Sequence, residues 1–171
     1  MKKFKGFTRT NFIKNLSGFT LIELLIVIAL LGALAAGLLA AIDPFEQLKK
    51  GTDTSIRGQA ESLYNATIAY YAQRAQLPTG LASGVTYTAS NLGNVISDLA
   101  AAGELKADFF DLAGIGKLSK IIVNVPNSES IVVCYTPQSK AFRNDQYTKY
   151  DFTGLTIADC PGSAGCYQCF K

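Results

Sequence analysis

The longest apolar stretch of the chain runs from Phe19 to Ile42 and contains one charged residue, Glu23. A helix of that length extends over about 36 Å, which is enough to cross the hydrocarbon core of a bilayer. A carboxylate inside such a span costs roughly 2.5–3.5 kcal/mol on insertion scales. The pattern therefore predicts a membrane-spanning helix in which Glu23 needs a partner or a purpose.

A second helical pattern runs from Pro44 to about Gln76. Asp43 before the proline and Glu46 after it are residue types expected at a helix start. Apolar positions then recur every 3.6 residues and predict one buried face. The members of this face are Phe45, Leu48, Ile56, Ala60, Leu63, Tyr70 and Leu77. Opposite charges four residues apart are expected on its exposed flank. They are Glu46–Lys50, Asp53–Arg57 and Arg57–Glu61.

The junction between the two helical patterns has two interpretations. One is a continuous helix with a kink at Pro44. The other is a segment between Gly32 and Asp43 that stretches or melts, followed by a new helix from Pro44. The second interpretation rests on Gly32 and Gly37, each of which costs about 1 kcal/mol of helix propensity relative to alanine.

Beyond this helix the chain changes to short β-branched runs. Three runs predict strands, at residues 85–88, 120–125 and 131–136. The last two predict an antiparallel hairpin, because only turn-forming residues separate them. Ser90 or Asn91 is expected to cap a short helix that precedes the hairpin. The sequence thus predicts an α+β fold, in which a long N-terminal helix packs its amphipathic half on a small antiparallel sheet.

Charge is unevenly distributed along the chain. The basic residues of the N-terminal leader are Lys2, Lys3, Lys5, Arg9 and Lys14. They are five of the 16 basic residues, and the leader holds none of the 13 acidic ones. This asymmetry predicts that the N-terminus stays in the cytoplasm. The chain also has no histidine, which excludes Ser-His-Asp and Cys-His catalysis. We therefore expect no enzyme, no metal site and no cofactor.

The hexapeptide GFTLIE at residues 18–23, placed between the basic leader and the apolar run, resembles the processing motif of type IV prepilins and type II secretion pseudopilins. The resemblance implies that a prepilin peptidase/methyltransferase cuts the Gly18–Phe19 bond and methylates the new amine of Phe19. It implies that Glu23 is the acidic assembly residue of the motif. It also divides the chain into a leader (1–18), a membrane or filament-core half of the first helix (19–43) and an extracellular globular domain (44–171).

For function, the resemblance implies a structural subunit of a type IV pilus-like filament. The precursor is expected in the inner membrane as a single-pass protein, from which an assembly platform polymerises identical subunits. Glu23 would then pair with the methylated amine of Phe19 on a neighbour. Two alternatives stay open: a type II secretion pseudopilin, and a signal-anchored extracellular domain that does not polymerise. A secretory signal peptide is a further interpretation, since Ala33-Leu34-Ala35 fits a cleavage site.

The chain contains four cysteines: Cys134, Cys160, Cys166 and Cys169. An even number in an exported region predicts two disulfides, for which three pairings exist. A bridge from Cys134 to the tail would attach the irregular C-terminus to the predicted sheet. The Cys166–Cys169 spacing leaves a four-thiolate zinc site and a redox-active pair as alternatives. The resemblance favours disulfides, because many pilins close a C-terminal loop in this way.

The region after Pro137 interleaves basic and aromatic residues. They are Lys140, Phe142, Arg143, Tyr147, Lys149 and Tyr150. Such a pattern can bind single-stranded nucleic acid through charge and stacking. Asp145 and Asp151 nearly cancel the charge, which favours a surface loop whose aromatic rings pack against the hairpin. Nucleic acid remains a secondary expectation for a partner.

Overall fold

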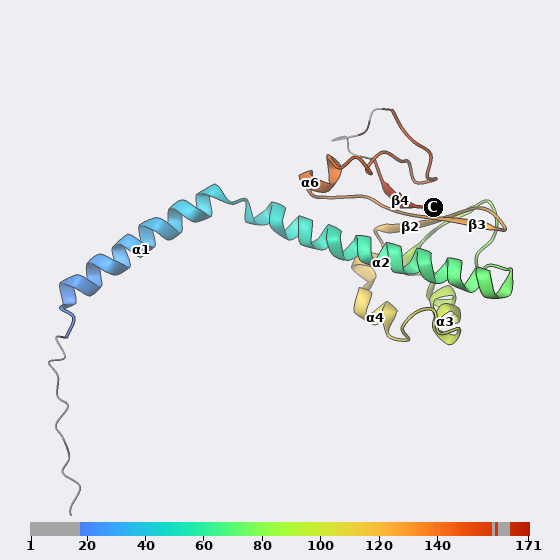
Figure 1. The fold of residues 1–171 in the computed structure, drawn as a ribbon, viewed down its shortest axis with the longest axis horizontal. Helices are drawn as coiled ribbons and strands as arrows, with labels where there is room; N and C mark the ends of the chain where they lie inside the picture. Colours follow the sequence, from blue (N-terminus) through green and yellow to red (C-terminus); the bar gives the residue numbers. More distant parts are fainter. Residues whose placement is uncertain (1–17, 159, 161–164) are drawn as a thin grey trace, which may run out of the picture. The chain divides into compact units, whose positions relative to one another are not determined.

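The computed structural model describes residues 18–158, 160 and 165–171. The predicted leader lies outside these residues except for Gly18. The chain forms two units, Met1–Asp43 and Pro44–Lys171, and each is described by itself. Figure 1 labels the helices and strands of both units.

The described part of the first unit is dominated by one helix, α1, at Leu21–Ala41. Every residue of α1 is exposed, and its side chains are apolar apart from Glu23. The helix continues through Gly32 and Gly37, so no melted segment lies between Gly32 and Ala41.

The second unit begins with α2 at Pro44–Arg74. A new helix from Pro44 is therefore confirmed. The predicted buried face is confirmed in its middle, where Ile56, Ala60 and Leu63 are at most 1% exposed. It is wrong at its start, because Phe45 and Leu48 are 72% and 69% exposed. Periodicity aligns apolar side chains on one face, but burial requires neighbouring elements beside them, and in α2 it begins at Asp53.

A four-stranded antiparallel sheet forms the other half of this unit. Its strands are β1 (Val85–Thr88), β2 (Ile121–Asn127), β3 (Ser130–Tyr135) and β4 (Gln168–Phe170). Neighbours in the sheet follow the order β1-β2-β3-β4. The three predicted strands and the hairpin are confirmed, with ends shifted by one or two residues. The C-terminal strand β4 was not predicted, because three residues after an irregular loop carry no readable alternation.

Short helices fill the connections. They are η1 (Ala89–Asn91), α3 (Gly93–Ala101), α4 (Phe109–Ala113), α5 (Ile115–Leu118) and α6 (Lys140–Arg143). The predicted cap at Ser90 or Asn91 is wrong. These two residues lie within the 3₁₀ turn η1, and α3 starts after Leu92 without a side-chain cap.

The core lies between α2, the sheet and the short helices. In Figure 1, the strands are drawn above α2, and α3 and α4 are drawn below it. Ile56 and Leu63 from α2, Leu99 from α3, and Val123 and Val133 from the central strands all belong to one buried cluster. In the strand order β1-β2-β3-β4, the C-terminal strand β4 is an edge strand of the sheet.

Candidate functional site

The start of α1 is a capping box formed by Thr20 and Glu23. The backbone N–H of Thr20 donates to Oε2 of Glu23 at 2.9 Å, and the Thr20 hydroxyl donates to the same oxygen at 2.8 Å. In return, the Glu23 N–H donates to Oγ1 of Thr20 at 3.3 Å. Two N–H groups that a helix start would leave unpaired are thereby satisfied.

This capping box gives Glu23 a partner within its own helix. The expected partner of Glu23 was the amine of Phe19, whereas the structure shows Thr20 as well. The signal was present, since Thr followed three residues later by Glu is the capping-box pattern. The N–H of Thr20 belongs to the peptide bond after Phe19, so cleavage of the Gly18–Phe19 bond leaves the box intact.

The capping box occupies one of the two carboxylate oxygens of Glu23. Both bonds from Thr20 reach Oε2, while Oε1 accepts no hydrogen bond from the residues that the structure describes. Phe19 beside it is 83% exposed. The site can therefore accept a further donor at Oε1 without losing the helix cap.

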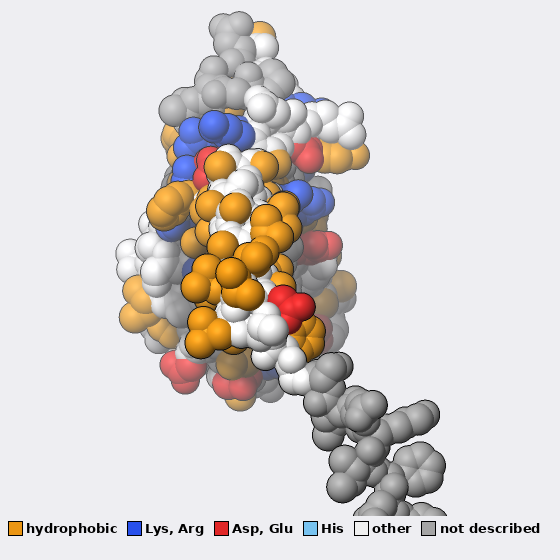
Figure 2. Space-filling model, turned by 90° about the vertical axis from the view of Figure 1, so that its left-hand side faces the viewer, with side chains coloured by type: hydrophobic (Ala, Val, Ile, Leu, Met, Phe, Trp, Pro, Cys, Tyr) orange, Lys and Arg blue, Asp and Glu red, His pale blue; other side chains and the backbone are white. Residues whose placement is uncertain are grey.

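The helix that carries this site is long and apolar enough to cross a membrane, by its length and composition. Its mean hydropathy over the most apolar window is 2.8, and no residue in that window is buried. Figure 2 shows hydrophobic side chains covering most of the surface of α1 that faces the viewer. A helix of this kind requires either lipid or other protein around it.

The C-terminal region is tied to the sheet by a disulfide between Cys134 on β3 and Cys169 on β4. The two cysteines are direct partners in the strand register. A second disulfide joins Cys160 and Cys166 and closes a much shorter loop. Of the three possible pairings, the structure contains this one. All four sulfur atoms are thus used in two disulfide bonds. A four-thiolate zinc site would require both bonds to be reduced.

A buried polar network supports the same strand. The Tyr135 hydroxyl donates to Oε1 of Gln168 at 2.5 Å, and the Gln168 amide donates to the Thr148 hydroxyl at 3.0 Å. Burial raises the pKa of Tyr135 well above its ordinary value. The tail is therefore held to the sheet by hydrogen bonds as well as by a covalent bridge.

Asp53 on α2 holds the segment that leads into α6. Its carboxylate accepts the Gln138 N–H at 3.0 Å, and it accepts the N–H and the hydroxyl of Ser139, each at 2.7 Å. Asp53 is 0% exposed, so the expected exposed pair with Arg57 is wrong. The helical pattern predicted that Asp53 pairs with Arg57 on the exposed flank. Only the tertiary fold brings the N–H groups of Gln138 and Ser139 against Asp53.

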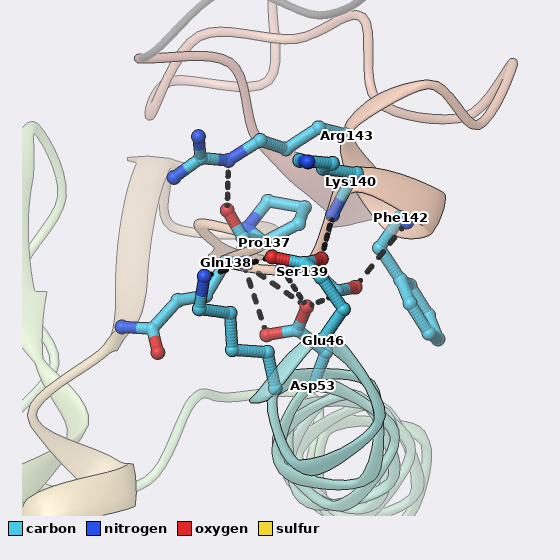
Figure 3. Close-up of polar contacts among 9 residues, drawn as sticks. Glu46, Asp53, Pro137, Gln138, Ser139, Lys140, Phe142 and Arg143 are labelled. Carbon is cyan, nitrogen blue, oxygen red and sulfur yellow. Dashed lines mark hydrogen bonds and ion pairs between the residues drawn. The ribbon is translucent and has the colours of Figure 1, made fainter. Parts of the chain in front are cut away.

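Glu46 extends this contact by two helical turns. Its Oε2 accepts the Lys140 N–H at 2.9 Å, and its Oε1 accepts the Lys49 ammonium at 2.8 Å. The hydrogen bond from Lys49, followed by that from Lys140, lowers the pKa of Glu46. Figure 3 shows both carboxylates rising from α2 towards residues 137–143. We call Asp53 and Glu46, with the backbone they bind, the carboxylate clamp.

The interleaved basic and aromatic residues do not form one surface. Lys140 belongs to the carboxylate clamp, and Nε of Arg143 donates to the Pro137 carbonyl. The ammonium groups of Lys149 and Lys171 lie over the ring of Tyr150, at 5.7 and 4.5 Å from its centre. Arg143 is thus engaged by Pro137, and Lys149 and Lys171 are engaged by Tyr150.

The loop after Tyr150 turns around Asp151. One oxygen of its carboxylate accepts the Thr153 N–H, the Thr153 hydroxyl and the Leu155 N–H, at 2.6–2.9 Å. Burial raises the pKa of Asp151, but the hydrogen bonds from Thr153, Leu155 and Gly154 together outweigh it and lower that pKa. Among the described residues, no group of three or more Cys, Asp or Glu side chains is arranged to hold a metal ion.

Comparison with protein families decides the class of the N-terminal segment. Residues 13–39 match the prokaryotic N-terminal methylation motif. The chain carries the prepilin signature. The match contains the Gly18–Phe19 bond, the capping box and most of α1, and it fits a membrane-anchored precursor of the structural, pilin-like type. No curated protein and no solved structure matches the chain.

Proposed function

We propose that the chain is the precursor of a structural subunit of a type IV pilus-like filament. The observation that carries this proposal is the prepilin motif at the start of a fully exposed apolar helix. Cleavage after Gly18 creates a free amine at Phe19, which is then methylated. The precursor lies in the inner membrane with a cytoplasmic N-terminus, and the filament is extracellular.

Assembly exchanges the lipid around α1 for the same helix of neighbouring subunits. Uniform leucine and isoleucine packing does not fix the axial register of such helices, whereas a charge pair does. The amine of Phe19 on an incoming subunit is the natural donor for Oε1 of Glu23 on a subunit already in place. The apolar surroundings strengthen that pair, although desolvation takes back part of the gain.

The capping box refines this mechanism. Because Thr20 holds Oε2 of Glu23, the carboxylate is oriented before a neighbour arrives. Oε1 remains available, so the intramolecular cap and the intermolecular pair do not compete for one oxygen. Thr20 is thus a positioning residue for Glu23.

The first test concerns processing. Mass spectrometry of the N-terminal peptide of exported protein is expected to show Phe19 with a methylated amine. Replacing Gly18 with a bulky residue should leave uncleaved precursor in the membrane. A mature N-terminus near Ala36, or an intact Met1, contradicts the proposal and supports a signal peptide or a plain signal anchor respectively.

The second test concerns assembly. Glu23→Gln should leave cleavage intact and abolish or slow filament formation, as seen by electron microscopy of surface filaments. Thr20→Val should weaken assembly less, since it removes the positioning but keeps the charge. Glu61→Gln, at an exposed position of α2, is the matched control. Normal filaments in the Glu23→Gln variant would show that Glu23 is not an assembly contact.

Two alternatives share the motif and are separated by the same strains. A type II secretion pseudopilin would give secretion defects in the Glu23→Gln strain and no native surface filaments. A signal-anchored domain would give neither filaments nor a Glu23-dependent defect. Native filaments that contain this chain support the pilus subunit over both.

A further inference from the structure

A polar recess lies beside the carboxylate clamp, at the end of the sheet where β2 begins and β3 ends. Its volume is about 350 Å³, which is in the size range of small-molecule sites. The side chains that argue for a ligand are Lys120, Thr136, Gln138, Arg143 and Tyr167. They come from the start of β2, the segment after β3, α6 and the residue before β4.

The recess is positively charged. Lys120 and Arg143 line it, and no carboxylate is among its lining residues. Both cations are half-buried. The Lys120 ammonium makes no hydrogen bond or ion pair with the described part of the chain. Two cations in one hollow without a lining carboxylate favour an anionic ligand.

Arg143 is prearranged to present its terminal nitrogens. Its Nε donates to the Pro137 carbonyl at 3.1 Å, and the segment that carries Pro137 is fixed by Asp53 through Gln138 and Ser139. In Figure 3 the terminal nitrogens of Arg143 lie beyond Pro137 on the side away from α2. A guanidinium held by Nε retains the paired N–H groups that match a carboxylate or phosphate.

Neutral groups complete the lining. The Thr136 hydroxyl and the Gln138 amide make no side-chain hydrogen bond within the described residues, and they lie in the same recess as the cations. Tyr167 and Ile122 add an aromatic ring and an apolar side chain. This combination suits a ring with hydroxyl groups on its edge and an apolar face.

We infer that the recess binds one acidic sugar unit, a pyranose ring that carries a carboxylate. Arg143 and Lys120 bind the carboxylate, Thr136 and Gln138 bind ring hydroxyls, and the ring face lies against Tyr167. The inference goes beyond the filament proposal, because it concerns a site on each single subunit.

A nucleic acid strand fits the recess less well. Strand binding uses several stacking rings along a continuous basic groove. The recess has one aromatic lining residue, Tyr167, and the ring of its neighbour Tyr150 is covered by the ammonium groups of Lys149 and Lys171. The lining therefore favours a single ring unit over a chain of stacked bases.

The test uses the full chain in detergent micelles, so its result does not depend on filament assembly. Calorimetric titration with trigalacturonate is compared with titration by the neutral galactose trimer and by a short oligothymidylate. We expect saturable binding of trigalacturonate that is at least about tenfold tighter than binding of the neutral trimer. Binding should weaken as salt is added.

Variants locate the site. Lys120→Gln removes a cation that makes no hydrogen bond or ion pair within the described residues, so it should weaken trigalacturonate binding about tenfold without altering the fold. Arg143→Gln and Tyr167→Ala should also weaken it, with folding checked by circular dichroism. Lys106→Gln, an exposed lysine outside the recess, is the matched control and should bind normally.

Four outcomes overturn the inference. They are equal binding of the acidic and neutral trimers, tighter binding of oligothymidylate, undiminished trigalacturonate binding in Lys120→Gln, and absence of saturable binding by any probe. None of these results bears on cleavage or filament formation.

Discussion

Asp53 and Ser139 are 86 residues apart in sequence, and the carboxylate of the first accepts both the N–H and the hydroxyl of the second at 2.7 Å. Ser139 in turn accepts the Phe142 N–H as the N-cap of α6. One buried carboxylate therefore orients the start of the entire C-terminal region. Cys160, Cys166 and Cys169 follow this contact in the sequence, as do Arg143 and Tyr167 of the recess.

Removing the Asp53 carboxylate should destabilise the globular unit. Asp53→Ala leaves two N–H groups and one hydroxyl without a partner, and buried unpaired donors are costly. We expect the free energy of unfolding to fall by about 3 kcal/mol, measured by urea titration of the full chain in detergent. Glu61→Ala, an exposed carboxylate on the same helix, should change it by less than about 0.5 kcal/mol. Equal effects would contradict a structural role for Asp53.

The two disulfides should differ in their contribution to stability. Cys134–Cys169 spans 35 residues and Cys160–Cys166 spans six. In the chain-entropy model these loops correspond to about 3.7 and about 2 kcal/mol. Replacing the first pair with serine should therefore lower the unfolding free energy more than replacing the second. A larger loss of unfolding free energy on replacing Cys160–Cys166 would contradict this order and show that loop length does not decide the contribution of each disulfide.

Acid should loosen the C-terminal region before the core. Hydrogen bonds lower the pKa of Glu46 and of Asp151 below the ordinary carboxyl value of about 4. A carboxyl whose pKa is lowered in the folded state stabilises the fold fully at pH values above its unfolded-state pKa. This stabilisation is lost as the pH falls through the pKa of the folded state. Hydrogen exchange from about pH 6 to about pH 2 should thus show residues 138–157 losing protection before α3. Simultaneous loss in both regions would contradict this order.

Two glycine substitutions should have opposite signs. Gly154 has a φ of +85°, and a Cβ there would lie 2.7 Å from Cγ1 of Val132. Gly154→Ala should therefore cost at least about 2 kcal/mol. Gly58 lies within α2 with open space around it, so Gly58→Ala should stabilise the helix by up to about 1 kcal/mol. Thermal unfolding of both variants measures the difference.

Local pattern was sufficient for much of this protein. The apolar run from Phe19, the new helix at Pro44 and the three strands before Pro137 could each be predicted from residues next to one another. The capping box of Thr20 and Glu23 is equally local, because its two residues lie three positions apart at the start of one helix. These features depend on spacing along one element, which the sequence states directly.

Tertiary structure alone decided which side chains serve the C-terminal region. The pairing of Cys134 with Cys169 required β4 to lie beside β3, and three residues gave no sign of that strand. The sequence pattern predicted Asp53 as one charge on an exposed helix flank, yet it is buried against Gln138 and Ser139. Contacts between distant segments depend on how the elements pack, and a helical or strand period contains no information about the partner that a face will meet.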